Sequence, residues 1–304
     1  MLYIILGILL FILLLVIVFA YICYRLTFYS NRKKSNKTVK LPDMEIFTTY
    51  KDIIFKDIED VNNMPCEYVS IKSRDGLTLK GRYFELKKGA PIEVMFHGYK
   101  GDSTRDMSSG VKRAFKCGRN ALIVDHRSSG ASEGHVITFG IKERFDCVDW
   151  VNFVVKKFGQ DVKIIIAGVS MGAATVLMAS SMNLPQNVVG VIADCGYNKA
   201  SDIIKKVITG MKLPAKLVYP FIKLGARIFG KFNLEEFSPY ESVQKTNDNF
   251  VPHDMSVKLY NACTSKKKMV TIENASHGVS YLVDPDKYIY ELQDFFSYIE
   301  DEKK

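Results

Sequence analysis

The 304-residue sequence lacks the short motifs by which cofactors and metal ions are commonly bound. It contains neither a G-x-G-x-x-G nor a P-loop, and no group of Cys, His and Asp residues has the spacing of metal ligands. Its six cysteines form no C-x-x-C and no paired spacing, so no disulfide framework is implied. We therefore expect a protein that works without a cofactor or a metal.

Charged residues are missing from the start of the chain. Residues 2–23 are dominated by Leu, Ile, Val and Phe, and this run is long enough to span a bilayer. A cleaved signal peptide normally begins with basic residues and ends at a small-residue site. Here nothing basic follows Met1, and the run ends in Tyr24 and Arg25. The sequence predicts an uncleaved transmembrane anchor over residues 1–24.

The net charge of +9 is concentrated just after this run. Six basic residues precede the first acid, Asp43, which leaves +3 for the rest of the chain. That distribution argues against a nucleic-acid-binding face and favours a basic linker, residues 25–42, beside anionic lipid. The positive-inside rule then places the following domain in the cytoplasm, with an extracytoplasmic domain as the alternative. The six residues are Arg25, Arg32, Lys33, Lys34, Lys37 and Lys40.

Strand and helix patterns alternate through residues 43–304, which predicts one α/β domain with a mostly parallel sheet covered on both faces. A helical cap of about residues 198–240 is inserted in this domain. The expected strands are 66–73, 77–86, 92–96, 120–125, 163–169, 188–194 and 268–273, and the other expected helices are 104–117, 141–158, 171–179 and one from about 285.

The most informative stretch is a G-x-S-x-G centred on Ser170. The apolar run 163–169 before it is typical of a buried parallel strand, and residues 171–179 after it read as a helix. A serine at such a sharp strand-to-helix turn has its hydroxyl exposed, and the two backbones nearly touch there. Gly168 and Gly172 meet that spatial demand. The pattern predicts a nucleophile elbow.

Several stretches together resemble the α/β-hydrolase superfamily, in the branch of serine aminopeptidase-like and prolyl-oligopeptidase-like domains. The chain is similar, more narrowly, to membrane-anchored hydrolases of clostridial-type bacteria, a resemblance that carries no defined substrate. The matching stretches are FHGYKG at 96–101, DHRSSGASEG at 125–134, GVSMGA at 168–173, ADCGY at 193–197, DNFVP at 248–252 and ASHG at 275–278.

The resemblance assigns catalytic roles to particular residues. Ser170 is the expected nucleophile and His277, after the last predicted strand, the expected general base. The backbone amides of Met171 and Tyr99 are the expected oxyanion donors. The other histidines are expected to be structural or solvated, and three charged residues of the 125–134 turn to brace their loop; these are His97, His126, His135, His253, Asp125, Arg127 and Glu133.

The catalytic acid is where the sequence departs from the superfamily pattern. Asp248 keeps the end of the acid motif, but residues 242–247 before it read SVQKTN and cannot form a buried strand. We expect a sheet that is one strand short beside the strand ending at Asp194, with a loop over residues 242–252 across the gap. Asp248 is the first candidate for the acid. Asp194 is the alternative, unless it caps the helix that follows it.

Three functions are compatible with these patterns. The first is a membrane-anchored serine hydrolase, esterase or peptidase-like, that cleaves an ester, thioester or small amide through an acyl-enzyme. The second is a catalytically impaired hydrolase-fold binding or scaffold protein, and the third is an acyltransferase. The expected partners are a small-molecule or short-peptide acyl substrate and, through the anchor, membrane lipid. The apolar cap packs on the domain or, alternatively, also touches the membrane.

Overall fold

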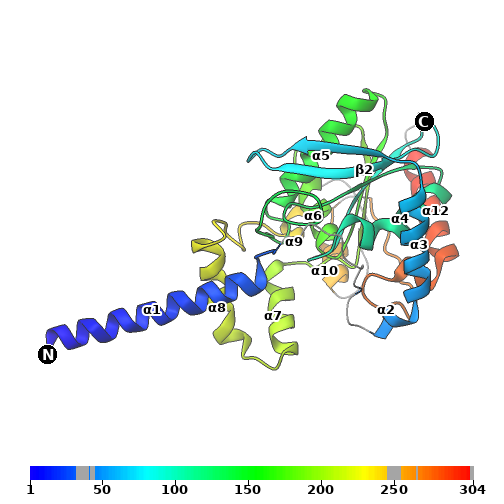
Figure 1. The fold of residues 1–304 in the computed structure, drawn as a ribbon. Coiled ribbons are helices and arrows are strands. Elements are labelled where there is room, and N and C mark those ends of the chain that lie inside the picture. Colours follow the sequence, from blue (N-terminus) through cyan, green and yellow to red (C-terminus); the bar gives the residue numbers. More distant parts are fainter. Residues whose placement is uncertain (32–40, 42–44, 245–254, 265, 302–304) are drawn as a thin grey trace.

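The computed structural model describes residues 1–31, 41, 45–244, 255–264 and 266–301 (Figure 1). A long amino-terminal helix projects from an α/β domain, and helices lie on both faces of a central sheet. The strands are β1 (Glu67–Lys72), β2 (Thr78–Phe84), β3 (Ile92–Phe96), β4 (Asn120–Val124), β5 (Ile164–Val169) and β6 (Val188–Asp194). The helices are α1 (Leu2–Thr27), α2 (Glu45–Thr49), α3 (Lys51–Asn63), α4 (Ser103–Lys116), α5 (Glu143–Phe158), α6 (Met171–Ser180), α7 (Ala200–Gly210), α8 (Ala215–Ile228), α9 (Pro239–Val243), α10 (Met255–Ala262), α11 (Ser280–Val283) and α12 (Pro285–Asp301).

The six strands are arranged in the order β1-β2-β4-β3-β5-β6. The hairpin β1–β2 is antiparallel and β2 pairs antiparallel with β4, whereas β3, β4, β5 and β6 run parallel. Parallel strands require crossover connections, and α4, α5 and α6 supply them. The predicted α/β class with a mostly parallel sheet is confirmed.

Alternate residues of the buried strands face two separate hydrophobic clusters. Val94 and Phe96 of β3 pack with α5, α6 and α9, whereas Met95 packs with α3, α4 and α12 on the other face. In β5, Ile166 packs in the first of these clusters and Ile165 in the second. Both faces of the sheet are therefore covered, which explains why β5 reads as a continuous apolar run. The charged residue of β3, Glu93, is buried between Arg113 and Arg119.

The predicted strand at residues 268–273 is wrong, because this segment joins no described sheet. Val270 and Ile272 nevertheless pack against the cluster beneath α4 and α12. A strand forms only where the edge of a neighbouring strand can pair with its backbone groups. The neighbour of this segment would have been the strand next to β6, which is the strand missing from the sequence. Among the described residues the sheet therefore ends at β6 and is two strands shorter than the full pattern, not one.

The expected loop across the gap begins later than predicted. Ser242 lies in the short helix α9, and its hydroxyl hydrogen-bonds to the carbonyl oxygen of Leu177 in α6. The remainder of that loop, from residue 245 to 252, lies outside the described residues.

Helix α1 is long and apolar enough to cross a bilayer. Its last turns are built into the domain, where Ala20, Cys23 and Tyr24 are buried. Ala20 lies against Gly225 of α8, and Cys23 and Tyr24 belong to the same cluster as Met171 of α6. After the helix, Ser30 donates its backbone N–H to the carbonyl oxygen of His135 at 2.8 Å. The end of α1 thus belongs to the core of the domain.

Candidate active site

Ser170 occupies the sharp turn between β5 and α6. Its backbone has φ 55° and ψ −111°, a strained conformation for a residue with a side chain. A Cβ atom at Gly172 would lie 1.9 Å from the carbonyl oxygen of Phe96, and one at Gly168 would lie 2.2 Å from the carbonyl carbon of Gly172. The elbow therefore requires glycine at both positions, as the sequence predicts.

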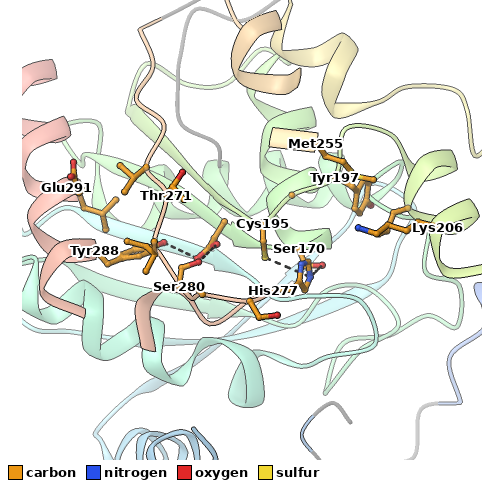
Figure 2. Close-up of a pocket in the computed structure, with 18 residues that line it drawn as sticks. Ser170, Cys195, Tyr197, Lys206, Met255, Thr271, His277, Ser280, Tyr288 and Glu291 are labelled. Carbon is orange, nitrogen blue, oxygen red and sulfur yellow. Dashed lines mark hydrogen bonds between the residues drawn. The ribbon is translucent and has the colours of Figure 1, made fainter. Parts of the chain in front are cut away.

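His277 lies against Ser170, although 107 residues separate them in the chain. The Nε2 atom of His277 is 2.9 Å from the Oγ atom of Ser170 and 3.9 Å from the Sγ atom of Cys195 (Figure 2). In the tautomer that carries its proton on Nδ1, the ring accepts the Ser170 hydroxyl proton at Nε2. The structure thus brings the two predicted residues together with the geometry of a nucleophile and its base.

The surroundings of His277 favour the neutral form of its ring. Desolvation lowers the pKa of His277 below its usual value, the negative charge of Asp194 opposes that shift, and the positive charge of Lys206 adds to it. A neutral imidazole at neutral pH can accept a proton, which a general base must do.

Asp194, at the end of β6, is the alternative acid of the sequence analysis. Its carboxylate accepts hydrogen bonds from the Ser280 hydroxyl and the Tyr288 hydroxyl, both at 3.2 Å. Burial raises the pKa of Asp194, while the positive charge of Arg113 and the two hydroxyls act in the opposite direction. The helix-capping alternative is wrong, because α7 begins at Ala200 without a side-chain cap and Asp194 faces α11 and α12 instead.

Asp248, the first candidate for the acid, lies outside the described residues. Within the part of the chain that the structure describes, the hydrogen bonds to His277 are made at Nε2, and no described carboxylate accepts one from Nδ1. Asp194 is the carboxylate that acts on His277 through its charge rather than through a direct hydrogen bond.

The turn after β3 lies beside the elbow, where the predicted oxyanion donors are. A Cβ atom at Gly98 would be 3.7 Å from the Cβ atom of Ser170. The backbone N–H groups of Tyr99 and Met171 donate no hydrogen bond to any described residue, so both are available to an added oxygen. The Asp106 carboxylate braces this turn by accepting the Gly98 N–H at 3.0 Å.

The Tyr99 side chain connects the same turn to the end of α1. Its hydroxyl donates a hydrogen bond of 2.6 Å to the carbonyl oxygen of Thr27, and the neighbouring Lys100 ammonium donates one of 2.9 Å to that of Leu26. Two of the last carbonyl groups of α1 therefore hold the predicted oxyanion turn in place.

The remaining described histidines and the charged residues of the 125–134 turn make structural contacts. His97 accepts the His126 backbone N–H at its Nε2, and the two rings are packed edge to face. Arg127 pairs with the buried Asp146, Glu133 accepts the Thr78 N–H, and Asp125 accepts the N–H groups of Ser103 and Ala131. His135 stacks on the ring of Tyr29. His253 lies outside the described residues.

Two pockets meet at the elbow, and Ser170, Asp194, His277 and Tyr288 line both of them. The first, of about 360 Å³, is lined by the residues that follow β6, Cys195 to Tyr197, and by residues 270–272 and 275–277 (Figure 2). The second, of about 470 Å³, is bounded by the oxyanion turn and is mostly apolar; its apolar lining includes Phe47, Met95, Met107, Val207 and Leu282.

Sequence patterns miss four residues of this site: Asp106, Cys195, Ser280 and Tyr288. Cys195 is the only one with a local signal, since it stands directly after the strand end at Asp194. The others reach the site through helix packing, which no short motif records. Among the described residues, no group of three or more His, Cys, Asp or Glu side chains is placed to hold a metal ion.

The comparisons with known proteins agree with this architecture. A family model described as alpha/beta hydrolase fold matches residues 94–230. The uncharacterized protein YqkD of Bacillus subtilis is 26% identical over 195 residues, which cover 60% of this chain and 64% of that protein. The chain thus spans a little under two thirds of that relative's length. The thiohydrolase aneE of Aspergillus aculeatus is 25% identical over 230 residues, which cover 67% of this chain and 71% of that protein.

The fold has solved counterparts. An esterase from Pyrococcus furiosus superposes with a TM-score of 0.62 at 18% identity, covering 88% of this chain and 99% of that one. The strand order, the matching family model and the solved structure show that the chain has the α/β-hydrolase fold.

Proposed function

We propose that this protein is a membrane-anchored serine hydrolase that cleaves an ester, a thioester or a small amide through an acyl-enzyme. The observation that carries the proposal is the 2.9 Å contact between Ser170 Oγ and His277 Nε2 at a strained elbow. A serine hydroxyl becomes a competent nucleophile when a neutral imidazole accepts its proton.

The reaction follows from the groups around the elbow. Ser170 Oγ attacks the substrate carbonyl carbon while His277 takes its proton, and the amides of Tyr99 and Met171 bind the oxygen that becomes negative. His277 then returns the proton to the leaving group, and an ester bond joins the acyl group to Ser170. A water molecule, deprotonated by His277, attacks this ester, releases the acid and restores the serine.

We assign the supporting carboxylate to Asp194 and retain Asp248 as the alternative. When His277 accepts the Ser170 proton it becomes positive, and the negative charge of Asp194 favours that state. The hydrogen bonds from Ser280 and Tyr288 keep the Asp194 carboxylate oriented. Asp248 would take the role if it accepts a hydrogen bond from His277 Nδ1.

The pockets favour a substrate with an apolar acyl group. The larger pocket has mostly apolar walls and borders the Tyr99 turn, so an acyl chain there would bring its carbonyl oxygen to the predicted donors. The names of the esterase and the thiohydrolase described above suggest the same chemistry for this chain, namely hydrolysis of oxygen or sulfur esters.

We propose that α1 is an uncleaved anchor rather than a signal peptide. Its last turns bury Ala20, Cys23 and Tyr24 in the domain, so cleavage would remove part of the packed core. The basic residues that follow the helix in the sequence favour a cytoplasmic domain.

Hydrolysis of p-nitrophenyl butyrate by the full-length protein in detergent tests the proposal. The wild type should turn over this ester, with a burst of p-nitrophenol if deacylation is slow, and Ser170→Ala should lower kcat by about 10³-fold or more. Ser297→Ala, at an exposed position of α12, serves as a matched control that should retain activity. Equal rates for Ser170→Ala and wild type would refute the proposal.

A binding or scaffold protein that no longer turns over is the second candidate. It is favoured by the short sheet and by the lack of a described acceptor at Nδ1 of His277. In that case the wild type would bind substrate-like esters without releasing product.

A further inference from the structure

The end of α1 is fixed to the domain by tight packing and by hydrogen bonds. A Cβ atom at Gly225 of α8 would lie 2.5 Å from the carbonyl oxygen of Ala20, so the two helix backbones are in close contact. The rings of Phe19 and Phe221 are 4.8 Å apart, and those of Tyr21 and Phe229 are 5.0 Å apart. The direction in which α1 leaves the domain is therefore set by the fold (Figure 1).

This fixed direction determines where a bilayer crossed by α1 would lie. From Leu2 to Phe19, before the first buried residue Ala20, the helix has 18 residues, or roughly 27 Å at about 1.5 Å per residue. The hydrocarbon core of a bilayer is about 30 Å thick. The membrane must therefore extend to the level at which α8 crosses α1, which brings the cap to the membrane surface.

The cap, whose helix α8 packs on α1, has many of the exposed apolar residues of the domain. If Met1 and helix α1 are set aside, nine large hydrophobic residues are exposed in the described structure. Five of these nine lie between residues 207 and 228. Met211 and Leu217 are 66% and 68% exposed. We call the set the cap face; it consists of Val207, Met211, Leu213, Leu217 and Ile228.

The charges around the cap face suit an anionic lipid surface. Residues 200–231 contain seven basic residues and a single acid, Asp202. Helices that combine exposed apolar residues with lysine and arginine bind at the boundary between headgroups and acyl chains. Solitary exposed apolar residues need no explanation, but five of them on two packed helices and their connection, among basic residues and beside α1, indicate a binding surface.

The cap face also reaches the candidate active site. Val207 is 54% exposed and at the same time lines the larger pocket, while Ile203 and Lys206, also on α7, line the smaller one. Helix α7 is therefore a rim shared by both pockets. An apolar chain that leaves the bilayer along α7 would pass Val207 and reach Ser170.

We propose that the cap face lies on the surface of the bilayer that α1 crosses, so that the pocket takes acyl esters with long apolar chains directly from the membrane. This inference rests on the proposed hydrolase function and names its substrate class. The partner that binds the cap face is a lipid bilayer with anionic headgroups.

Tryptophan quenching tests the docked position independently of catalysis. The chain has one tryptophan, Trp150, which is 1% exposed and gives a constant background. Full-length Leu217→Trp is reconstituted in vesicles of equal parts phosphatidylcholine and phosphatidylglycerol, with and without brominated acyl chains. The matched control is Tyr68→Trp, at a 79% exposed position on the edge strand β1. Bromine should quench the added emission of Leu217→Trp several-fold more than that of Tyr68→Trp, and equal quenching overturns the proposal.

A second arm tests the substrate class. Met211→Asp combined with Leu217→Asp should lower hydrolysis of p-nitrophenyl palmitate dissolved in the same vesicles by about tenfold or more, because two acids repel anionic lipid. The same variant should hydrolyse soluble p-nitrophenyl butyrate at the wild-type rate, and Tyr68→Asp should match wild type on both esters.

The outcomes separate the two proposals. If wild type hydrolyses neither ester, the proposed hydrolase function fails, while the quenching result still decides whether the cap face is docked. If wild type hydrolyses both esters and the double variant retains full activity in vesicles, the entry of substrate from the membrane is refuted and the hydrolase function stands.

Discussion

Replacing Tyr99 by Phe tests whether the end of α1 positions the oxyanion turn. The change removes one hydroxyl and with it the 2.6 Å hydrogen bond to the carbonyl oxygen of Thr27, while the ring contact with Phe139 is kept. A hydrogen bond of this kind contributes about 0.5–1.5 kcal/mol net. Since about 1.4 kcal/mol corresponds to a tenfold change in an equilibrium constant, the equilibrium constant between the working and displaced positions of the turn should fall about 2- to 10-fold.

The loss should appear in kcat and not in KM. In the proposed mechanism the Tyr99 amide acts on charge that develops only in the transition state, so a displaced turn should weaken catalysis without weakening substrate binding. We expect kcat for p-nitrophenyl butyrate to fall measurably, by up to about 10-fold, at unchanged KM and at a temperature well below unfolding. Lys100→Met, which removes the neighbouring hydrogen bond to Leu26, should add to the effect.

The control is Tyr68→Phe, which removes an exposed phenol from β1 and should leave kcat at the wild-type value. A merely structural hydroxyl would lower the unfolding temperature of Tyr99→Phe and leave kcat unchanged. That result would refute the coupling between α1 and the oxyanion turn.

Three further predictions follow from the site and from the packing of α1. Because desolvation lowers the pKa of His277, the acid limb of kcat/KM against pH should have its midpoint below about 6.5, with activity present above that pKa and lost as pH falls through it. Lys206→Gln should raise this midpoint and Asp194→Asn should lower it. Shifts of the reverse sign would contradict the electrostatic assignment. Asp194→Asn should lower kcat on the order of 10²-fold, less than the roughly 10⁴-fold of a directly hydrogen-bonded acid, whereas a larger loss in Asp248→Asn would transfer the role to that residue. Gly225→Ala should destabilise the protein by about 1–3 kcal/mol, because the added Cβ atom would lie 2.5 Å from the carbonyl oxygen of Ala20 in α1. Thermal unfolding in detergent measures this loss, and an unchanged unfolding temperature would show that the two helices are not in close contact.

Local patterns were sufficient to predict most of the sheet and the elbow. The strands Ile92–Phe96 and Val188–Asp194 have the predicted bounds, because most of their residues are apolar and both faces of each strand are covered. The two glycines of the elbow could be explained from the motif alone, since close backbone approach leaves no room for a side chain.

The errors arose where structure depends on a neighbour rather than on local sequence. Residues 268–273 have the composition of a strand, but a strand forms only beside an edge to which it can bond. Residues 25–42 look like a simple basic linker, yet Phe28 at its start is fully buried against the cap. No local pattern could place the Tyr288 hydroxyl on Asp194 or the Tyr99 hydroxyl on Thr27, since each contact joins segments more than 70 residues apart.

Intact-protein mass spectrometry after treatment with a fluorophosphonate tests the central claim most directly, because the probe reports an activated serine without requiring knowledge of the substrate. The account predicts one covalent adduct on the full-length wild type, located on Ser170 by peptide mapping. The adduct should be absent from Ser170→Ala and form much more slowly in His277→Ala, with both variants folded as judged by circular dichroism. Equal labelling of wild type and Ser170→Ala, or a folded wild type that takes up no probe, would contradict the assignment of Ser170 and His277 as nucleophile and base.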